Sequence, residues 1–199
     1  LDHVVPVNKA VLVVGGGVTG MTSALGLADQ GFKVFLVEKS NTLGGVARSL
    51  RKTLSGDDVR AHIEELSQRT LSHDKIQVMT NAMIVDHSGM PGLFKTGLQV
   101  APRWQYRQIE HGVTILATGA IPNRPQQYLL DEHDAVMTQL NLDGVIEDVP
   151  ERVKGWEKVV MIQCVGSRIK ENPNCSRICC QAALKNALRI LDINPEAQI

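Results

Sequence analysis

The sequence has few of the features that mark nucleic-acid-binding proteins and membrane proteins. Its Lys and Arg residues number 21, as do its Asp and Glu residues, and no basic run or aromatic-basic interleaving occurs. The longest apolar stretches, such as Ala10 to Val14 and Val159 to Ile162, are only strand-sized, and no charged segment followed by an apolar one opens the chain. We therefore expect a soluble, cytoplasmic protein with no nucleic-acid partner and no membrane insertion.

Familiar catalytic motifs are also absent. The sequence has no serine elbow and no P-loop lysine. It therefore contains no recognisable motif for acyl transfer or phosphoryl transfer. None of the six histidines has HExxH-type spacing, and we interpret all of them as surface or structural residues: His3, His62, His73, His87, His111 and His133. We therefore assign no catalytic residue.

Cysteine is absent before Cys164 and then occurs four times, at Cys164, Cys175, Cys179 and Cys180, with the spacing C-x10-C-x3-C-C. A secreted disulfide framework would scatter its cysteines, so this clustering favours a reducing compartment and a metal or iron-sulfur site. The segment from Ser176 to Asp192 has a helical pattern, with an apolar face formed by Ala183, Leu184, Ala187, Leu188 and Leu191.

The cysteine spacing predicts a specific arrangement of ligands. If Cys175 opens the helix, Cys175 and Cys179 lie on one side, and three thiolates converge at the positive end of the helix dipole. Cys164, at the end of the expected strand from Lys158, would complete the ligand set. Four thiolates suit a cubane iron-sulfur cluster, with zinc as the less favoured occupant.

The first part of the chain has the pattern of a βαβ unit. Lys9 to Val14 is a short apolar run typical of a buried parallel strand, and it leads into the glycine loop Gly15-Gly-Gly17-Val18-Thr19-Gly20. A helix is expected from Met21 to Gln30, with Gly31 at its C-terminal end. A second strand from Lys33 to Val37 then ends at Glu38.

Each residue of this unit suits the binding of a dinucleotide. Gly15 permits the tight turn, Gly17 lets the backbone approach the phosphates, and Gly20 lets helix and strand pack closely. The helix N-terminus offers N–H groups to the pyrophosphate. Glu38 lies where a carboxylate accepts hydrogen bonds from a ribose, which favours a free 2′-hydroxyl. The alternative is a Rossmann unit whose site stays empty.

Further strands and glycines continue the pattern. A second glycine pair, Gly44 and Gly45, follows Lys39, and Val113 to Ala120 has the pattern of a strand that ends in an Ala-Thr-Gly turn at Thr118 and Gly119. Between them we expect a helix and four more strands, over Gly56–Ser72, Lys75–Thr80, Met79–Asp86, Leu93–Val100 and Gln105–Glu110.

This arrangement resembles the FAD domain of the thioredoxin reductase and glutathione reductase group. The resemblance implies that Leu-Gly-Gly after the Glu38 strand and the Ala-Thr-Gly turn lie near FAD. It further implies that the backbone of Asn81 to Met83, including Ala82, contacts the adenine. The expected fold is α/β: a Rossmann-like FAD-binding domain with a parallel sheet and a small crossover sheet, followed by the start of a second Rossmann-like domain.

The second half of the chain has a different residue pattern from the first half. Ile121 to Pro125 is the best boundary, and Met137 to Gly144 predicts a short helix with Thr138 as N-cap. Lys158 to Cys164 looks like the first strand of a second nucleotide-binding domain, but no GxGxxG follows it. We expect an FAD-binding domain over 1–122, a connection over 123–157, and a partial second α/β domain over 158–199.

From about Lys9 onward the chain resembles the flavin-containing A subunit of heterodisulfide reductase. The resemblance rests on Val159 to Arg168, Cys175 to Cys180 and Val136 to Leu140. It implies that the four cysteines ligate a four-iron four-sulfur (4Fe-4S) cluster near FAD, as the metal ligands of an anaerobic electron-transfer flavoprotein. The flavin of that family either splits electron pairs between acceptors or passes them between partner chains, so iron-sulfur and hydrogenase- or dehydrogenase-type proteins are the expected partners.

The chain departs from methanogen members of that family. It lacks cysteine around Arg51 to Asp58, an inserted ferredoxin module between Val100 and Val113, and the late Gly-Asp segment that holds the flavin ribityl chain. It also opens at Leu1, so we expect a processed chain, a fragment or a split subunit. Two other functions stay open: a disulfide reductase that uses Cys179 or Cys180 as a flavin-coupled thiol, and a zinc-stabilised Rossmann scaffold without catalysis.

Overall fold

The structure, a computed structural model, describes residues 6–199, so His3 lies outside the described residues. These residues form two compact units. Unit 1 comprises the described residues up to Arg48 together with Ala61–Ala120, and unit 2 comprises Ser49–Arg60 and Ile121–Ile199. The segment Ser49–Arg60 therefore interrupts unit 1 in sequence and belongs to unit 2 by its contacts.

The helices and strands follow one another in this order: β1 (Val11–Val14), α1 (Val18–Asp29), β2 (Val34–Val37), the 3₁₀ helix η1 (Gly45–Ser49), α2 (Val59–Ser72), β3 (Ile76–Met79), β4 (Ala82–Met90), β5 (Leu93–Val100), β6 (Gln105–His111), β7 (Val113–Leu116), α3 (Gln139–Asp148), α4 (Pro150–Lys154) and α5 (Cys179–Ile193).

The core of unit 1 is a four-stranded parallel sheet in the order β3-β2-β1-β7. Val11 is paired with Val34 on one side and with Val113 on the other, so β1 is central. The strand order reverses between β1 and β7, and ligands of such sheets bind at the carboxyl ends of the strands near that reversal. The Rossmann-like α/β fold expected from the sequence is confirmed.

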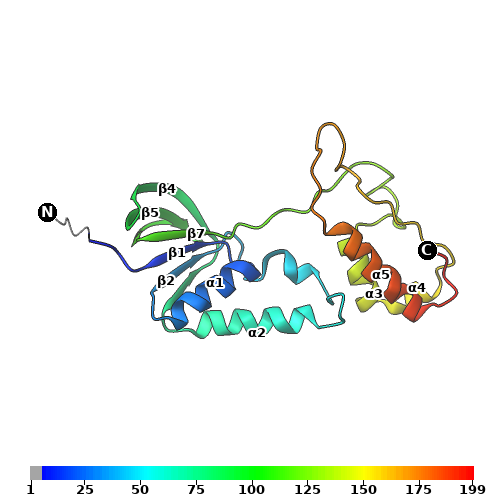
Figure 1. The fold of residues 1–199 in the computed structure, drawn as a ribbon, viewed down its shortest axis with the longest axis horizontal. Helices are drawn as coiled ribbons and strands as arrows, with labels where there is room; N and C mark the ends of the chain where they lie inside the picture. The colour runs from blue at the N-terminus through cyan, green and yellow to red at the C-terminus, as the bar shows by residue number, and fades with distance from the viewer. Residues whose placement is uncertain (1–5) are drawn as a thin grey trace. The chain divides into compact units, whose positions relative to one another are not determined.

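Different layers cover the two faces of this sheet (Figure 1). Val11 and Val13 pack with α1 and with Leu66 of α2, whereas Leu12 packs with Leu98 and Ile109 of the antiparallel sheet β4-β5-β6. Successive side chains of β1 therefore belong to two separate apolar clusters, as expected for a strand that is buried on both faces.

α2 begins later than its sequence pattern predicts. The predicted start was Gly56, but Gly56 has a φ of 94° and lies in a turn, closed by a bridge between Lys52 and Asp58. The helix therefore starts at Val59. Gly31, at the end of α1, has a φ of 95° and donates its N–H to the carbonyl of Ala28, as predicted.

Unit 2 contains α3, α4 and α5 around a small apolar cluster. Leu142 and Ile146 of α3, Val153 of α4 and Ile190 of α5 are buried there. Thr138 caps α3 by accepting a hydrogen bond from the N–H of Asn141 at 3.2 Å, which confirms the predicted N-cap. Among the described residues, no helix combines the length and apolar character needed to cross a membrane.

Two sequence predictions for α5 were wrong. α5 begins at Cys179, so Cys175 precedes the helix and cannot share its face. The predicted apolar face is also largely exposed: Leu184 and Leu188 are 65% and 58% accessible. The reason is that Lys185 and its neighbours turn inward to charged partners on α3, and these contacts fix the rotation of the helix.

The predicted strand from Lys158 to Cys164 is not a regular strand. Lys158 forms a single parallel bridge, to Gln198, and Val160 and Ile162 beyond it are 83% and 50% exposed. Val159 and Met161 still pack against the apolar cluster. The segment therefore has the alternation of a strand but lacks the neighbouring strands that would complete a ladder.

Candidate functional site

The loop between β1 and α1 is shaped by close backbone contacts. Gly15 has a φ of 108°, and a Cβ there would lie 2.2 Å from the carbonyl oxygen of Ala117. A Cβ on Gly20 would lie 1.8 Å from the carbonyl oxygen of Gly15. These contacts place the first turn of α1 directly beside the backbone that leaves β1 and β7.

Gly17 marks open space at the N-terminus of α1. It is the N-cap residue, and a Cβ there would meet no described atom within 4 Å. The first turn, with Val18 and Thr19, has no acidic side chain, and Gly17 has no side chain that could bond its N–H groups. Free N–H groups and the positive end of the helix dipole attract an anion. This space fits the pyrophosphate of a dinucleotide.

The second glycine pair, Gly44 and Gly45, lies against the glycine loop that follows β1. Gly44 forms a parallel bridge with Gly17, and the Gly44 N–H donates to the carbonyl of Gly16 at 2.7 Å. A Cβ on Gly45 would lie 3.3 Å from the Cα of Gly17. Two backbone segments therefore border the space at Gly17, and the expected proximity of Gly44 and Gly45 to FAD stays a prediction.

Glu38 is buried at the end of β2 and is held by three donors. Its Oε2 accepts the Gly16 N–H at 2.6 Å, and its Oε1 accepts the N–H and the hydroxyl of Ser40 at 2.7 and 2.6 Å. Burial acts to raise the pKa of Glu38, but the bonds from Ser40 and Gly16, with exposed Lys39 nearby, together lower it below its usual value. The carboxylate is therefore ionised and fixed beside the glycine loop, where it can accept ribose hydroxyls.

The predicted adenine contacts are only partly available. Asn81 has a φ of 48°, and the N–H of Ala82 already donates to the carbonyl of Glu38 at 3.0 Å. Met83 is 51% exposed at the start of β4. Of this backbone, the N–H of Ala82 is therefore not free to bind a base, and an adenine contact there stays a prediction.

The turn after β7 is the last part of the predicted FAD site. Ala117 donates its N–H to the carbonyl of Val14 at 2.8 Å, which continues the pairing of β7 with β1. Thr118 and Gly119 follow and are exposed, and a Cβ on Gly119 would meet no described atom within 4 Å. This turn lies at the carboxyl edge of the sheet, as do the glycine loop and Glu38.

The four cysteines lie in unit 2, and none of them forms a disulfide. Cys175 and Cys180 are exposed, and Cys164 and Cys179 are partly buried. Cys164 has a φ of 61°, in an irregular segment that runs up to α5. Within residues 6–199, no three His, Cys, Asp or Glu side chains are gathered so that they could hold a metal ion. The expected convergence of three thiolates is therefore absent, and the four-cysteine ligand set stays a prediction.

Hydrogen-bond donors lie near two of the sulfur atoms at the start of α5. The Arg177 N–H points to the Sγ of Cys175 at 3.4 Å, and the Ser176 hydroxyl lies 3.8 Å from the Sγ of Cys179. The first turn of α5 contains no acidic residue.

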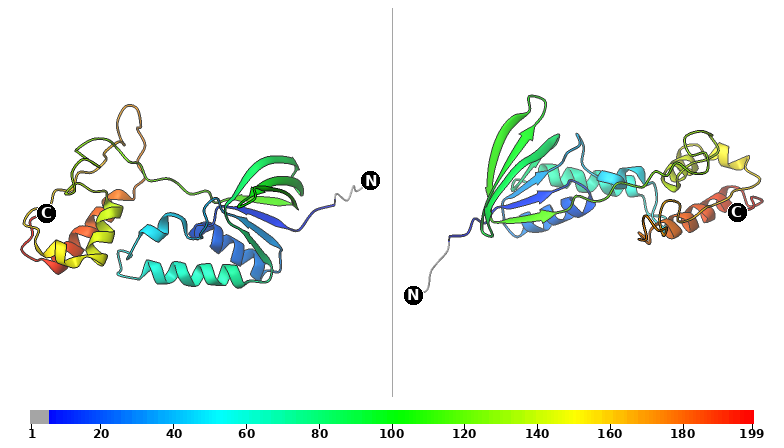
Figure 2. Two further views of the ribbon diagram at one scale, coloured as in Figure 1. Left: turned by 180° about the vertical axis from the view of Figure 1, so that it is seen from behind. Right: turned by 90° about the horizontal axis from the view of Figure 1, so that it is seen from above.

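α3 and α5 run parallel and side by side, as Figures 1 and 2 show. Asn186 of α5 donates to the Gln139 carbonyl at the start of α3, and Arg189, one turn later, pairs with Glu147 nearer the end of α3. The N-termini of both helices are therefore at the same end of the pair, the end that carries Cys179 and Cys180.

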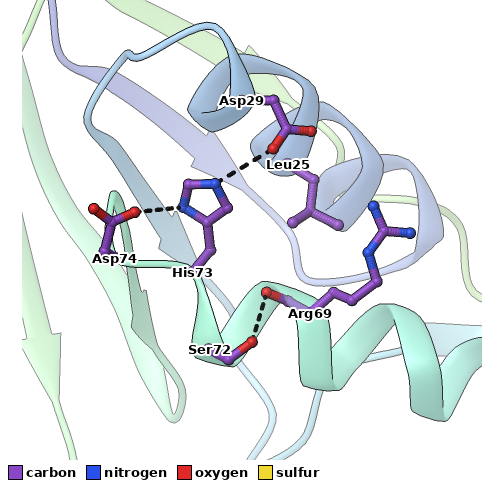
Figure 3. A pocket seen from close by; sticks show the side chains of 6 residues that line it. All are labelled: Leu25, Asp29, Arg69, Ser72, His73 and Asp74. Carbon is purple, nitrogen blue, oxygen red and sulfur yellow. Dashed lines mark hydrogen bonds and ion pairs between the residues drawn. The ribbon is translucent and has the colours of Figure 1, made fainter.

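A shallow pocket of about 400 Å³ lies between the carboxyl ends of α1 and α2 (Figure 3). There the ring of His73 lies between the carboxylates of Asp29 and Asp74, at 3.4 and 3.3 Å. The carboxyl ends of these helices lie at the amino edge of the parallel strands, opposite the glycine loop. This pocket is therefore separate from the dinucleotide site.

Sequence reasoning missed the charged side chains that connect α3 and α5. Asp143 and Glu147 are four residues apart on α3, and Lys185 and Arg189 are four residues apart on α5. These matched spacings were a usable signal, because residues at i and i+4 lie on one helix face. The pairing of the two faces requires the parallel packing, which the sequence pattern alone does not give.

Comparison with known proteins identifies the class. A family model described as FAD dependent oxidoreductase matches residues 10–117, which is more than half of the chain. These residues include the glycine loop, Glu38, the second glycine pair and the whole of β7. The chain belongs to the FAD-dependent oxidoreductase family.

Curated relatives narrow the resemblance to the A subunit of heterodisulfide reductase. The chain is 28% identical to the A subunit of the H(2)/formate:CoB-CoM heterodisulfide,ferredoxin reductase of Methanococcus maripaludis. It is 27% identical to the iron-sulfur A subunit of the CoB–CoM heterodisulfide reductase of Methanocaldococcus jannaschii. Each match covers 100% of this chain and 44% of the relative. The resemblance predicted from the cysteine motif is confirmed, and the chain spans less than half the length of these relatives.

A solved structure supports the fold alone. L-proline dehydrogenase from P. horikoshii is 22% identical and superposes with a TM-score of 0.50, over 73% of this chain and 29% of that chain.

Proposed function

We propose that this chain is the FAD- and iron-sulfur-dependent electron-transfer part of a heterodisulfide reductase-like complex. The observation that carries the proposal is the coexistence of two features in one chain. Unit 1 has an open, backbone-lined space at Gly17 beside the ionised Glu38, and unit 2 has all four thiols of the chain, none of them in a disulfide. One relative is named an iron-sulfur subunit, which supports this pairing.

The residues of unit 1 would hold the adenosine and pyrophosphate half of FAD. The N–H groups at the start of α1 would bind the pyrophosphate, with Gly17, Gly44 and Gly45 permitting close backbone approach. Glu38 would accept hydrogen bonds from ribose hydroxyls through lone pairs that Gly16 and Ser40 leave open. Bound FAD would supply the exchange between two-electron and one-electron chemistry.

The thiols of unit 2 suit an iron-sulfur cluster by donor chemistry. Cys164, Cys175, Cys179 and Cys180 supply the four sulfur ligands that such clusters require, and a bound 4Fe-4S cluster would carry single electrons. Their positions in the structure do not form a ligand set in advance. Binding would therefore have to fix the irregular segment before α5, as metal binding commonly does when it is coupled to folding.

We further propose that the chain works with other subunits. The relatives are themselves named as subunits of reductases, and this chain spans less than half of their length. Partner chains would deliver or accept the electrons, and iron-sulfur proteins and hydrogenase- or dehydrogenase-type proteins are the proposed classes. If the flavin splits electron pairs instead of passing them on together, it requires two such acceptors with different reduction potentials.

Anaerobic purification of the chain, supplied with FAD, iron and sulfide, tests the proposal. We expect flavin bands together with broad iron-thiolate absorption, and iron and acid-labile sulfide in equal amounts. Zinc without iron would instead support the scaffold function. Flavin with no metal, together with loss of two thiols on oxidation, would support a flavin-coupled disulfide reductase. A chain that retains neither flavin nor metal would contradict the proposal.

A further inference from the structure

Ser40 lies in the loop that leads from β2 to the second glycine pair, and its backbone is bonded on both sides. Its N–H donates to Glu38 Oε1 at 2.7 Å, and its carbonyl accepts the Asn81 N–H at 2.9 Å. All three residues belong to unit 1, so these contacts involve nothing from unit 2. The position of Ser40 is therefore set by backbone groups and does not depend on its side chain.

The Ser40 hydroxyl adds a second contact to the same carboxylate oxygen. Its Oγ lies 2.6 Å from Glu38 Oε1 and 2.9 Å from the carbonyl oxygen of Thr42. A serine hydroxyl has one hydrogen, so it donates to one of these acceptors at a time. The shorter distance and the negative charge of the carboxylate both favour Glu38, because hydrogen bonds to charged acceptors are the stronger ones.

The two oxygens of Glu38 are therefore not equivalent. Each carboxylate oxygen offers about two acceptor positions. Oε1 accepts both donors of Ser40, which fills it, whereas Oε2 accepts only the Gly16 N–H at 2.6 Å. The open acceptor position of this carboxylate is then on Oε2, the oxygen that contacts the glycine loop.

The surroundings of Glu38 leave the Ser40 hydroxyl as its only side-chain donor. A Cβ on Gly16 would lie 2.5 Å from Leu43 Cδ2 and 3.1 Å from Glu38 Oε2, so Leu43 and Glu38 both pack against the glycine loop. Lys39, which is exposed, is the one charged residue of the described part of the chain that acts on the carboxylate. The other two hydrogen bonds come from backbone N–H groups.

We propose that Ser40 is a positioning residue for the ribose site, because it occupies Oε1 of Glu38 and leaves Oε2 to accept a ribose hydroxyl. This inference rests on the proposed function for the identity of the ligand. Ser40 acts through Glu38 and not on the ligand itself. A carboxylate that is fixed before the ligand arrives loses less entropy on binding, which strengthens FAD retention.

The test compares three variants of the full chain. Ser40→Ala removes the hydroxyl and keeps both backbone bonds, whereas Ser40→Thr keeps the hydroxyl. Asn41→Ala is the matched control, because Asn41 is the next residue, is exposed, and makes no side-chain hydrogen bond to the described residues. Each chain is titrated with FAD and with an FAD analogue whose adenosine ribose lacks both hydroxyls.

We expect Ser40→Ala to bind FAD about 3- to 10-fold more weakly at neutral pH, the effect of releasing one ordered side chain. Ser40→Thr and Asn41→Ala should stay within about twofold of the unmutated chain. The analogue should bind the Ser40→Ala chain and the unmutated chain equally well, because it has no ribose hydroxyl to donate to Glu38.

The pH dependence of FAD binding gives a second measurement. Burial acts to raise the pKa of Glu38, and the hydrogen bonds from Ser40 and Gly16, with Lys39 nearby, lower it overall. Loss of the Ser40 hydroxyl removes one of the lowering contributions. As the pH is lowered, FAD affinity should therefore begin to fall at a higher pH in Ser40→Ala than in Ser40→Thr or the unmutated chain.

Unchanged FAD affinity with an unchanged pH profile in Ser40→Ala would overturn the inference. Equal weakening of FAD and of the analogue would also overturn it, because it would show general damage to the site. Failure of Ser40→Thr to restore binding would count against the hydroxyl. An unmutated chain that retains no FAD at all would instead overturn the proposed function, and this inference with it.

Discussion

The two units of this protein are built from different interactions, and their candidate sites differ in the same way. Unit 1 is held by two apolar clusters on the faces of a complete parallel sheet. Unit 2 has one smaller apolar cluster, a buried charged network around Asp143, and long irregular segments. The candidate dinucleotide site in unit 1 is lined mainly by backbone, whereas the proposed thiol site in unit 2 would consist of side chains.

The difference explains why one site is preformed and the other is not. Strand pairing and helix packing fix backbone groups such as those of Gly15 and Gly17 directly, so the open space at Gly17 exists once the sheet forms. Cys164 and Cys175 lie on backbone that no ladder or helix holds. If the sulfur atoms bind the proposed cluster, their positions would be fixed by it, as in metal sites that form only with their metal.

The largest predicted effect tests the side-chain site. Cys179→Ala should remove the iron, because each of four thiolates is needed where the backbone gives no support. We expect iron and sulfide per chain to fall by more than the roughly 10- to 100-fold that loss of an outer-shell partner costs. Anaerobic metal analysis measures this. The neighbouring exposed Gln181→Ala is the control, and unchanged iron in Cys179→Ala would reject Cys179 as a ligand.

The next effect tests the backbone site. Gly17→Val should place a side chain in the pyrophosphate space and weaken FAD binding by about 100-fold, equivalent to about 3 kcal/mol. A flavin fluorescence titration measures it, and undiminished retention would count against the loop assignment.

A matched pair of smaller changes sharpens this test. A Cβ on Gly17 or on Gly26 would meet no described atom within 4 Å, and both residues are at α1. Gly17→Ala should weaken FAD binding, whereas Gly26→Ala should leave FAD binding alone and stabilise unit 1 by about 0.5–1 kcal/mol. Equal effects on FAD would mean that Gly17 does not face the ligand.

The sequence predicted unit 1 well because its signals are local and repeated. The apolar runs at Val11–Val14 and Val34–Val37 are buried strands, and the glycine loop follows the first of them directly. Glu38 was identified by its place at the end of a strand. The hydrogen bonds from Gly16 and Ser40 could not be predicted, because they depend on a contact between two loops.

Unit 2 was predicted less well because distant contacts override its local pattern. The apolar stripe of α5 predicted that Leu184 and Leu188 face the core, but the bonds of Lys185 and Arg189 to Asp143 decide which face is buried. The segment after Lys158 has a strand pattern without neighbouring strands. The helix start at Cys179, rather than Cys175, likewise follows from the backbone before it and not from helix propensity.

Between pH 5 and 8, we expect a pH-dependent change in the stability of unit 1. His111 is buried where β6 ends, and burial lowers its pKa, with His87 nearby adding to the effect. Its Nδ1 lies 3.1 Å from the Val113 carbonyl, which can only accept, so Nδ1 carries the hydrogen and Nε2 accepts from the Thr96 hydroxyl. With His111 neutral, Thr96 donates to His111 and accepts from His87, whereas protonation of His111 would reverse the direction of both bonds.

The sign of the effect follows from the lowered pKa. Above about pH 6.5, His111 is neutral in both the folded and the unfolded chain and contributes no pH dependence. As the pH falls below that value, only the unfolded chain takes up the proton, so the free energy of unfolding of unit 1 should decrease. His111→Leu should flatten this slope, and a slope that persists unchanged would contradict the assignment.

Tryptophan fluorescence can separate the two units in this measurement. Trp104 is in unit 1, between β5 and β6, and Trp156 is in unit 2, where it packs against the apolar cluster. Denaturant unfolding of Trp156→Phe and Trp104→Phe chains between pH 5 and 8 therefore reports each unit alone. The exposed His62→Gln on α2 is the control, which should keep the slope of the unmutated chain.

The smallest predicted effect concerns the stability of unit 2 and tests the N-cap of α3. Thr138→Ala removes the hydroxyl that accepts the Asn141 N–H, and should destabilise unit 2 by about 1 kcal/mol, whereas Thr138→Ser should restore most of it. Trp156 fluorescence measures this. The cap belongs to unit 2 and the glycine loop belongs to unit 1, so FAD affinity should stay unchanged. Unchanged stability of unit 2 in Thr138→Ala, or a fall in FAD affinity, would contradict this prediction.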